Sequence, residues 1–507
     1  MAPSRTRAIA ELAVALTADS ISARRNDDGA EAGPSSHRKR AVRTRLLMEQ
    51  LGPFYIKLGQ VLATRPDFMS GVMMDELAHL QDRVTAQPFA VFEPVLNEEL
   101  NGDWRRCFAS IDTGRPLGSA SLAQAYRVTL RSGEPAVLKV QRPGIRARVL
   151  ADMAAAGRAA RLASRVSPPR VNAIVDMSTT LGVVFGAMQP ELDFTVEAGT
   201  MEQARRAARS FRHVSVPDVL MATPRLIVQS MAPGVSIRDA DLTRFSQQRC
   251  TEIGRDLLAF MYHGYYIERM FHADPHPGNI FIDPGYGATV IDWGMVGRLD
   301  RTLSAMTMLT VTNMAMNDAR GASQGWIQMG HATQWADIGG FTDDMERMLP
   351  RLVSSSLGES NFGVALLAVL RSAARRGIRS SPMVALLGKS FANAEGSVRC
   401  IAPGLVIADV LKDVIVDVLI ELARELLSSE QACRFAMDTM LNAMVTGDQG
   451  RGMLRDITNR EFAIKVGLLP GSAMPNSAGS LLPAGTAALA GLALLGSWRV
   501  YRGQRGR

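Results

Sequence analysis

Hydrophobic and polar positions divide the chain into two helical regions with a different pattern between them. Residues 41 to 110 carry apolar residues at steps of three and four, as in RTRLLMEQLGPFYIKLGQVLATR, a spacing typical of amphipathic helices. Pro53, Pro66 and Pro88 divide this region into short helices, because proline ends or kinks a regular helix. From residue 241 to about 470 the spacing again indicates mostly helices.

Between these regions the pattern is that of short strands. The runs AQAYRVTL and AVLKVQ are separated by the turn signal SGEP and predict a hairpin. A helical stretch from about 145 to 210 follows, and then the strand-like runs VSVPDVL and RLIVQSM. Near 271 to 300, the runs NIFI and ATVIDW interrupt the second helical region. This order predicts an α+β, predominantly helical, two-lobed fold like that of protein kinases, with an added N-terminal helical extension.

Five parts of the chain are expected from this pattern. Residues 1–44 form a flexible basic arm and residues 45–110 form the helical extension. Residues 111–235 form an N-lobe with inserted helices, and residues 236–470 form a helical C-lobe that carries the catalytic and metal-binding loops. Residues 471–507 comprise a linker, an apolar segment and a basic tail.

Composition narrows the choice of partners. The net charge of +8 favours an anionic partner, such as a membrane surface, a nucleotide or a nucleic acid. Aromatic residues make up only 6% and are not interleaved with basic stretches, which argues against nucleic acid. The four cysteines form no CxxC pair, so neither a disulfide framework nor a zinc ribbon is expected.

The C-terminal segment SLLPAGTAALAGLALLGSW, residues 480 to 498, is uncharged, and the basic tail RVYRGQRGR follows it. About 18 apolar residues are at the short limit for a membrane span. We expect a membrane-spanning or interfacial helix there, with the catalytic domain on the cytoplasmic side; a buried terminal helix is the alternative.

Candidate chemistry is concentrated in MFHADPHPGNIFID, residues 270 to 283. Asp274 and Asn279 have the five-residue step of the kinase catalytic loop HRDxxxxN. Asp292 and Gly294 follow in VIDWG, at the place of the kinase DFG motif. Because Mg²⁺ prefers oxygen ligands, Asn279 and Asp292 are expected to share it while Asp274 faces the phosphoryl acceptor.

A second part of the candidate site lies upstream. Lys139 in AVLKV stands in a predicted strand, like the lysine of the kinase VAIK motif, and would contact the ATP phosphates. A turn of Gly118, Ser119, Ala120 and Ser121 would lie over them. Each signal is weak alone, since the lysine could be solvated on an edge strand and the turn could be ordinary. Their joint order and spacing favour the kinase interpretation.

A histidine-based metal site is the alternative for the same loop. His272 and His276 have the HxxxH spacing that binds zinc on a helix. Pro275 and Pro277 make a regular helix improbable, and no glutamate or third ligand cluster accompanies the histidines. The two histidines are therefore expected to orient the loop through hydrogen bonds.

The motifs HADPHPGN, IDWG, AVLKVQRPG and FYIKLGQVLATRPD together resemble the atypical kinase family variously called ABC1, AarF, ADCK or UbiB, over about residues 45 to 300. The KxGQ signature, here Lys57, Gly59 and Gln60, is peculiar to that family. The resemblance implies ATP and Mg²⁺ as cofactors and makes the predicted helical extension the KxGQ extension.

The resemblance also implies roles for acidic residues in ELDFTVEAG. Glu197 is the expected helix partner of the nucleotide-binding Lys139. Glu191 and Asp193 look like the family's ExD motif, which faces the KxGQ residues. Two departures are visible: the loop reads GSAS where the family is richer in alanine, and Trp293 replaces the Phe of DFG. The larger ring should still pack.

In this family the KxGQ helices cover the place where a kinase binds a protein substrate. The resemblance therefore implies a membrane-associated, Mg²⁺-dependent, ATP-binding kinase or ATPase that supports isoprenoid-quinone biosynthesis or related lipid metabolism. Its expected partners are a membrane lipid or an isoprenoid or phenolic lipid, and a lipid-biosynthesis complex. The alternatives are a non-catalytic, nucleotide-gated scaffold for a lipid-modifying complex and an active protein kinase.

Overall fold

The computed structural model describes residues 34–63, 65, 69–80, 85–166, 177–353 and 361–426, together with short pieces between 8 and 19 and residue 437. The chain divides into two compact units, Met1–Glu425 and Leu426–Arg507. The apolar segment 480–498 lies outside the described residues. No helix within the described ranges is both long and apolar enough to cross a membrane.

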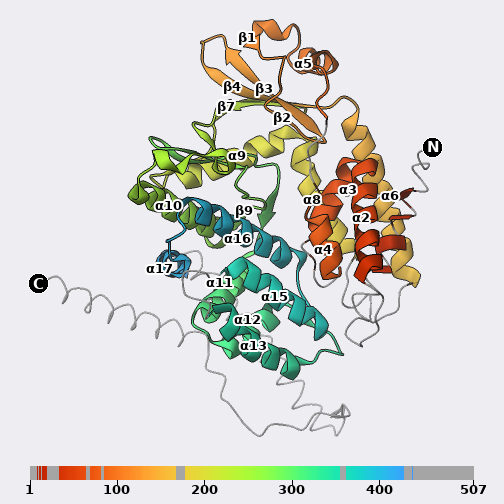
Figure 1. The fold of residues 1–507 in the computed structure, drawn as a ribbon, viewed down its shortest axis with the longest axis vertical. Coiled ribbons are helices and arrows are strands. Elements are labelled where there is room, and N and C mark those ends of the chain that lie inside the picture. The colour runs from red at the N-terminus through yellow and green to blue at the C-terminus, as the bar shows by residue number, and fades with distance from the viewer. Residues whose placement is uncertain are drawn as a thin grey trace, which may run out of the picture. The chain divides into compact units, whose positions relative to one another are not determined.

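A six-stranded antiparallel sheet forms the smaller lobe, in the order β1-β3-β4-β7-β6 with β2 paired to β3 (Figure 1). Its strands are β1 (Phe108–Ile111), β2 (Gly118–Ser119), β3 (Ala123–Leu130), β4 (Pro135–Gln141), β6 (Val219–Ala222) and β7 (Leu226–Ser230). Ala136, Leu138 and Val140 on β4 are fully buried in the core shared with helix α5 (Glu93–Glu99). Because side chains alternate along a strand, Lys139 points to the opposite face of the sheet. The predicted β3–β4 hairpin is confirmed.

Three helices near the N-terminus and two helices that follow β4 form a bundle, here called the N-terminal bundle, with a hydrophobic core of its own (Figure 1). They are α2 (Pro34–Leu51), α3 (Pro53–Leu62), α4 (Gly71–Leu77), α6 (Ile145–Val166) and α8 (Met177–Leu192). Gly52, with φ +106°, makes the turn between α2 and α3, a conformation that favours glycine.

The prediction of a flexible arm over residues 1–44 is wrong for its last part. Residues 34–44 lie in α2, and Ala41 and Thr44 are 1% and 0% exposed. Ala8 and Leu12 are also buried in the core of the bundle. The basic residues of this segment dominate its composition, whereas its few small and apolar residues decide how it packs.

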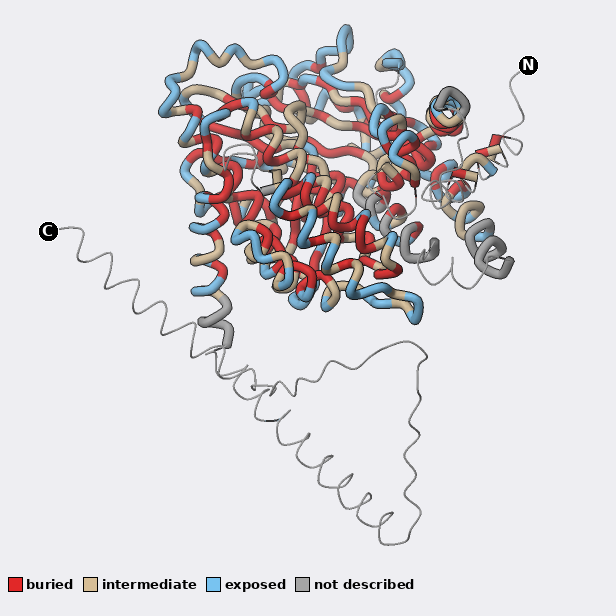
Figure 2. Tube along the Cα trace, turned by 60° about the horizontal axis from the view of Figure 1, so that its bottom comes forward, coloured by how far each residue is buried: buried red, intermediate tan, exposed pale blue. Residues whose placement is uncertain are grey.

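The larger lobe is mainly helical. Its helices, with α9 joining it to the sheet, are α9 (Phe194–Ala208), α10 (Gln247–Tyr266), α11 (Arg301–Ala315), α12 (Ala319–Met329), α13 (Ile338–Val353), α15 (Phe362–Arg375), α16 (Pro382–Ile401) and α17 (Ile407–Leu426). Helix α16 packs against both α10 and α15. Figure 2 shows buried segments running through this region and exposed residues at its outer turns.

The larger lobe also contains short strands, which form three small sheets within the described residues. β5 (Val214–Ser215), β11 (Gly287–Val290), β10 (Ile280–Asp283) and β8 (Val235–Ser236) form one sheet, β9 (Met270–His272) pairs with β12 (Val296–Arg298), and β13 (His331–Ala332) pairs with β14 (Ile378–Arg379). β10 and β11 form an antiparallel hairpin, whereas β5 joins β11 in parallel.

Candidate active site

Lys139 lies on β4, near the middle of the sheet. Its Nζ is 3.0 Å from both carboxylate oxygens of Glu197, which comes from the first turn of α9 and is 1% exposed. The same Nζ is 3.2 Å from Oδ1 of Asp292. The fold thus brings together the lysine, its expected helix partner and the aspartate of the DWG motif.

Lys139, Glu197 and Asp292 shift the pKa values of one another. Burial alone would lower the pKa of Lys139, but the negative charges of Asp292 and Glu197 reverse this and raise it well above its usual value. Lys139 in turn holds the pKa of Asp292 well below its usual range. Burial raises the pKa of Glu197, and Lys139 opposes that effect. Because the Asp292 side chain is 51% exposed, water weakens its attraction to Lys139 and can reach its carboxylate.

Of the predicted turn Gly118–Ser121, Gly118 and Ser119 lie in strand β2, and β3 separates them from the strand that carries Lys139. Gly118 is opposite Ala125, and Ala125 is opposite Lys139, so turn and lysine share one cross-section of the sheet. The largely buried Arg142 holds the turn, because its Nε donates to the Ala120 carbonyl oxygen at 2.9 Å and its Nη2 to the hydroxyl of Ser119 at 2.8 Å. These contacts fix the backbone of the segment that lies across β3 from Lys139.

Histidine rings order the loop that follows β9. The backbone N–H of Asp274 donates to Nδ1 of His272 at 3.1 Å, so Nε2 is the protonated nitrogen and donates to the Ile291 carbonyl oxygen at 3.1 Å. Burial lowers the pKa of His272, which keeps the ring neutral. Nδ1 of His276 accepts the N–H of Gly278 at 2.9 Å. These hydrogen bonds agree with the predicted orienting role of both histidines.

The β10–β11 hairpin brings Asn279 and Asp292 to one end of the sheet. The N–H of Ile291 donates to the Asn279 carbonyl oxygen at 2.9 Å, as expected for a turn-bounded strand pair between the two residues. Asn279 Nδ2 donates to the Asp274 carbonyl oxygen at 3.2 Å, so its Oδ1 is the atom that could bind a cation. Asp292 has φ +60°, a left-handed conformation that is uncommon outside glycine and concentrated at functional sites.

Asn279 and Asp292 offer a donor set that suits Mg²⁺. This ion usually takes one or two carboxylates from the protein and completes its shell with water and phosphate oxygens. Among the residues that the structure describes, no group of three His, Cys, Asp or Glu side chains could hold a metal ion. The alternative site at His272 and His276 therefore finds no third ligand of these types within the described ranges.

Lys57 on α3 forms an ion pair with Glu191 at the end of α8. The surroundings of Gly294 show that this ion pair lies next to the two acidic partners of Lys139. A Cβ atom on Gly294 would lie 3.7 Å from Cγ of Glu191, 3.7 Å from Oε2 of Glu197 and 3.5 Å from Oδ1 of Asp292. The structure therefore places the KxGQ lysine and the first acid of the ExD motif next to the residues of the kinase motifs.

Among the other KxGQ and ExD residues, Gly59 serves the packing of a helix and Asp193 serves the start of another. A Cβ atom on Gly59 would lie 2.2 Å from Cδ1 of Leu80, so the glycine permits close packing of α3. Gln60 is half-buried on the same helix. Asp193 is the N-cap of α9, and its carboxylate accepts the N–H of Thr195 at 3.1 Å. Asp193 thus helps to begin the helix that presents the partner of Lys139.

None of the sequence motifs points to α16, yet two of its side chains contact Asp274. Asn393 Nδ2 donates to Oδ1 of Asp274 at 2.6 Å, and Lys389 Nζ is 3.4 Å from Oδ2. Burial would raise the pKa of Asp274, but the positive charge of Lys389 lowers it and keeps the carboxylate ionised.

Two serines of α16 hold the backbone of the same loop. Ser390 Oγ donates to the His272 carbonyl oxygen at 2.5 Å, and Ser397 Oγ donates to the Pro275 carbonyl oxygen at 2.8 Å. Lys389, Asn393 and Ser397 are four residues apart and share one helix face. Polar residues at that spacing in a mostly buried, apolar helix are the sequence signal that could have found them.

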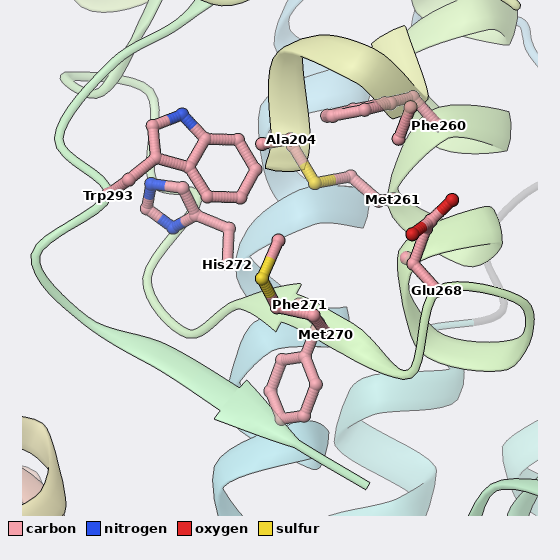
Figure 3. Close-up of a pocket in the computed structure, with 10 residues that line it drawn as sticks. Ala204, Phe260, Met261, Glu268, Met270, Phe271, His272 and Trp293 are labelled. Atoms are coloured by element: carbon pink, nitrogen blue, oxygen red, sulfur yellow. The ribbon is translucent and has the colours of Figure 1, made fainter. Parts of the chain in front are cut away.

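Trp293 packs under the site, as expected for the larger ring. It is 2% exposed, and its Nε1 donates to the Val290 carbonyl oxygen at 3.1 Å. Its ring meets His272 edge-on, with ring centroids 5.0 Å apart. Figure 3 shows Trp293 and His272 at one side of a small cavity and Glu268 at the other. The cavity is about 10 Å³, near the minimum for one water molecule.

The lobes and the arrangement of these residues define a kinase-like protein, and comparison with known proteins gives the family. The model described as ABC1 atypical kinase-like domain matches residues 79–325. The chain is 33% identical over 395 residues to the probable protein kinase UbiB of Azotobacter vinelandii, which covers 73% of this chain and 70% of that protein. The chain belongs to the ABC1 atypical kinase-like family.

Two further comparisons give a similar sequence and a similar fold. An uncharacterized protein of Synechocystis sp. is 31% identical over 369 residues, covering 70% of this chain and 89% of that protein. The solved structure of the Rv3197–erythromycin complex from Mycobacterium tuberculosis shares the fold, with a TM-score of 0.50 and 19% identity over 65% of this chain and 83% of that chain. The predicted α+β, kinase-like fold is confirmed.

Proposed function

We propose that this chain is a Mg²⁺-dependent, ATP-binding atypical kinase or ATPase. The observation that supports this most directly is the contact of Lys139 Nζ with both oxygens of Glu197 and with Oδ1 of Asp292. In protein kinases the corresponding lysine–glutamate pair and metal-binding aspartate must both be in place for phosphoryl transfer.

Each part of the site has a role in this proposal. Lys139 binds the phosphates of ATP, and the turn Gly118–Ser121 covers them. Asn279 and Asp292 hold Mg²⁺, which supplies positive charge against the phosphate oxygens when it is bound. Asp274 faces the acceptor, which is water in an ATPase and a hydroxyl group in a kinase.

We further propose that the acceptor is a lipid-like molecule at a membrane and that the activity supports isoprenoid-quinone biosynthesis. The Lys57–Glu191 ion pair supports this, because it places a helix of the N-terminal bundle next to the site, where it would obstruct an extended polypeptide. The net charge of +8 favours an anionic surface, and the resemblance to the UbiB family supports the quinone pathway.

ATP turnover by the purified chain tests the proposal. Wild type and Asp292→Asn are compared with and without liposomes of anionic phospholipid that contain a phenolic isoprenoid lipid. Wild type is expected to hydrolyse ATP faster with liposomes, and Asp292→Asn to lose roughly 10²-fold or more, since metal-assisted charge stabilisation is lost. Asp409→Asn is the matched control, because Asp409 is 57% exposed on α17 and pairs with Lys412 on the surface.

Other outcomes select other functions. Nucleotide binding without turnover under every condition would favour the non-catalytic scaffold. Transfer of labelled phosphate to a protein in place of lipid or water would favour an active protein kinase. Equal turnover by wild type and Asp292→Asn would reject the proposed site.

A further inference from the structure

Helix α16 presents a cation and an amide to the carboxylate of Asp274. Asn393 Nδ2 donates to Oδ1 at 2.6 Å, and Lys389 Nζ lies 3.4 Å from Oδ2. The two side chains therefore engage different oxygens of one carboxylate. Both come from a helix that begins at Pro382, beyond the residues 79–325 that the family model matches.

Helix α16 is rigidly joined to the loop that it contacts. Ser390 Oγ donates to the His272 carbonyl oxygen and also lies 2.9 Å from the buried hydroxyl of Tyr265. Ser397 Oγ donates to the Pro275 carbonyl oxygen at 2.8 Å. Contacts at both ends of the loop segment fix the position of the Lys389 stem relative to the loop.

Lys389 and Asp274 remain accessible from the site. Their side chains are 23% and 27% exposed, so neither is sealed inside the core. Lys57 and Lys139 form ion pairs with Glu191 and Glu197, and the positive charge of Lys57 also contributes to the lowered pKa of Asp274. Lys389 lies within ion-pair distance of Asp274, and its charge is the largest of the positive charges that lower the pKa of this carboxyl.

Phosphoryl transfer creates a charge problem at this place. The acceptor oxygen forms a bond to the γ-phosphorus of ATP while the bond from that phosphorus to the β,γ-bridging oxygen breaks. ADP leaves with the electron pair, and the acceptor's proton goes to Asp274 or to solvent. The anionic phosphoryl group must pass close to the anionic Asp274, and an adjacent cation offsets that repulsion.

We propose that Lys389 is a catalytic residue that binds the phosphoryl group during transfer, and that Asn393 is a positioning residue that orients Asp274 toward the acceptor. This proposal rests on the proposed function. It places two residues of α16, a helix without any of the kinase motifs, at the part of the site where the acceptor binds. The fixed amide donor on Oδ1 turns Oδ2 toward the acceptor and Lys389.

A transition-state mimic separates this role from ordinary nucleotide binding. Binding of Mg²⁺-ADP, and of Mg²⁺-ADP with aluminium fluoride, is measured for wild type, Lys389→Met, Lys389→Arg and Asn393→Ala. Lys389→Met is expected to bind Mg²⁺-ADP within about 3-fold of wild type but to lose roughly 10²-fold in affinity for the aluminium fluoride complex. Turnover should fall by a similar factor in kcat with little change in the KM for ATP.

The companion variants distinguish chemistry from folding. Lys389→Arg keeps the charge and should recover most of the affinity for the fluoride complex. Asn393→Ala should lower kcat while leaving Mg²⁺-ADP binding unchanged. Lys412→Met is the control for loss of one lysine charge, and it should behave as wild type in every measurement. Thermal unfolding of each variant reports whether the fold is kept.

Three results would overturn the inference. If wild type binds Mg²⁺-ADP and Lys389→Met matches it with aluminium fluoride and in kcat, Lys389 does not touch the phosphoryl group, and the proposed function is unaffected. If Lys389→Met loses ADP affinity and thermal stability together, its role is structural. If wild type binds no Mg²⁺-ADP, the proposed function fails and this inference fails with it.

Discussion

Glu197 shows how one buried residue restricts the rest of the site. Its side chain is 1% exposed, so an ionised carboxylate there needs a cation at hydrogen-bond distance. Lys139 supplies this cation through two contacts of 3.0 Å. The pair holds Lys139 on the side of Asp292, which is half exposed and accessible to a metal ion. The buried carboxylate of Glu197 is therefore the partner of the lysine, and the exposed carboxylate of Asp292 is the candidate ligand of the metal.

A second buried carboxyl predicts how stability depends on pH. Glu395 on α16 is 0% exposed and accepts the hydroxyl of Tyr262 at 3.0 Å. Burial raises its pKa to about 8, although Tyr262 and the positive charge of Arg399 oppose this. The folded chain therefore keeps a proton that the unfolded chain releases above its ordinary pKa. The associated stability is fully present below the unfolded pKa and is lost as pH rises to about 8.

The Glu395→Gln variant should lack this loss. We expect its free energy of unfolding, relative to wild type, to increase on the order of 2 kcal/mol between pH 5.5 and pH 8.5. Thermal unfolding midpoints at both pH values measure the change. Glu346→Gln is the control, because Glu346 is 46% exposed and pairs with Arg320 on the surface. Parallel pH profiles for Glu395→Gln and wild type would show that Glu395 does not hold a proton in the folded chain.

At the scale of elements, the sequence pattern predicted the hairpins, because a hairpin is formed by residues that are close together in the chain. The β3–β4 hairpin follows from alternating apolar residues on both sides of the turn SGEP. The placement of Asn279 beside Asp292 follows from a hairpin of few residues between them. The strand β8 has only two residues, too few to show alternation, and it forms by pairing with β10.

Helix α16 could not be connected to the site from the sequence, because its contacts are long-range. Lys389 is more than 100 residues from Asp274, and no fixed spacing relates a helix face to a distant loop. The structure supplies this relation by packing α16 against α10 and by placing it near β12. The prediction of a flexible arm was wrong for a similar reason, since the burial of Ala41 depends on the surrounding helices and not on its neighbours in the chain.

The close approach of Gly234, just before β8, to the neighbouring strand β10 offers a test of element packing. Gly234 has φ +75°, and a Cβ atom there would lie 2.0 Å from the carbonyl oxygen of Ile282 on β10. Gly234→Ala should therefore lower the free energy of unfolding by roughly 3 kcal/mol, through backbone strain and displacement of β10. Differential scanning calorimetry measures the loss.

Gly199→Ala on α9 is the matched control for this change. Apart from the neighbouring backbone of α9 itself, no heavy atom lies within 4 Å of a Cβ atom at Gly199, and alanine favours a helix interior by roughly 0.5–1 kcal/mol. This variant should unfold at or above the wild-type temperature. If Gly234→Ala were as stable as Gly199→Ala, the close approach of residue 234 to β10 would be incorrect.

At the scale of the whole molecule, the fold joins a sheet, an N-terminal helical bundle and a larger helical lobe around one set of charged residues. Lys57 comes from the bundle, Lys139 from the sheet and Lys389 from the larger lobe. Each faces a carboxylate at the site. The sequence predicted the first two through motifs, and the third depends on tertiary packing alone. Membership of the ABC1 family agrees with this architecture.

The most direct test of the central claim is calorimetric titration of ATP in the presence of Mg²⁺ and in the presence of EDTA. Wild type is expected to bind ATP with Mg²⁺ and to lose roughly 10-fold or more in affinity without it. Asp292→Asn should bind with little dependence on Mg²⁺, and Lys139→Met should bind weakly in both conditions. Equal ATP affinity with and without Mg²⁺ in wild type, or unchanged binding by both variants, would contradict the account.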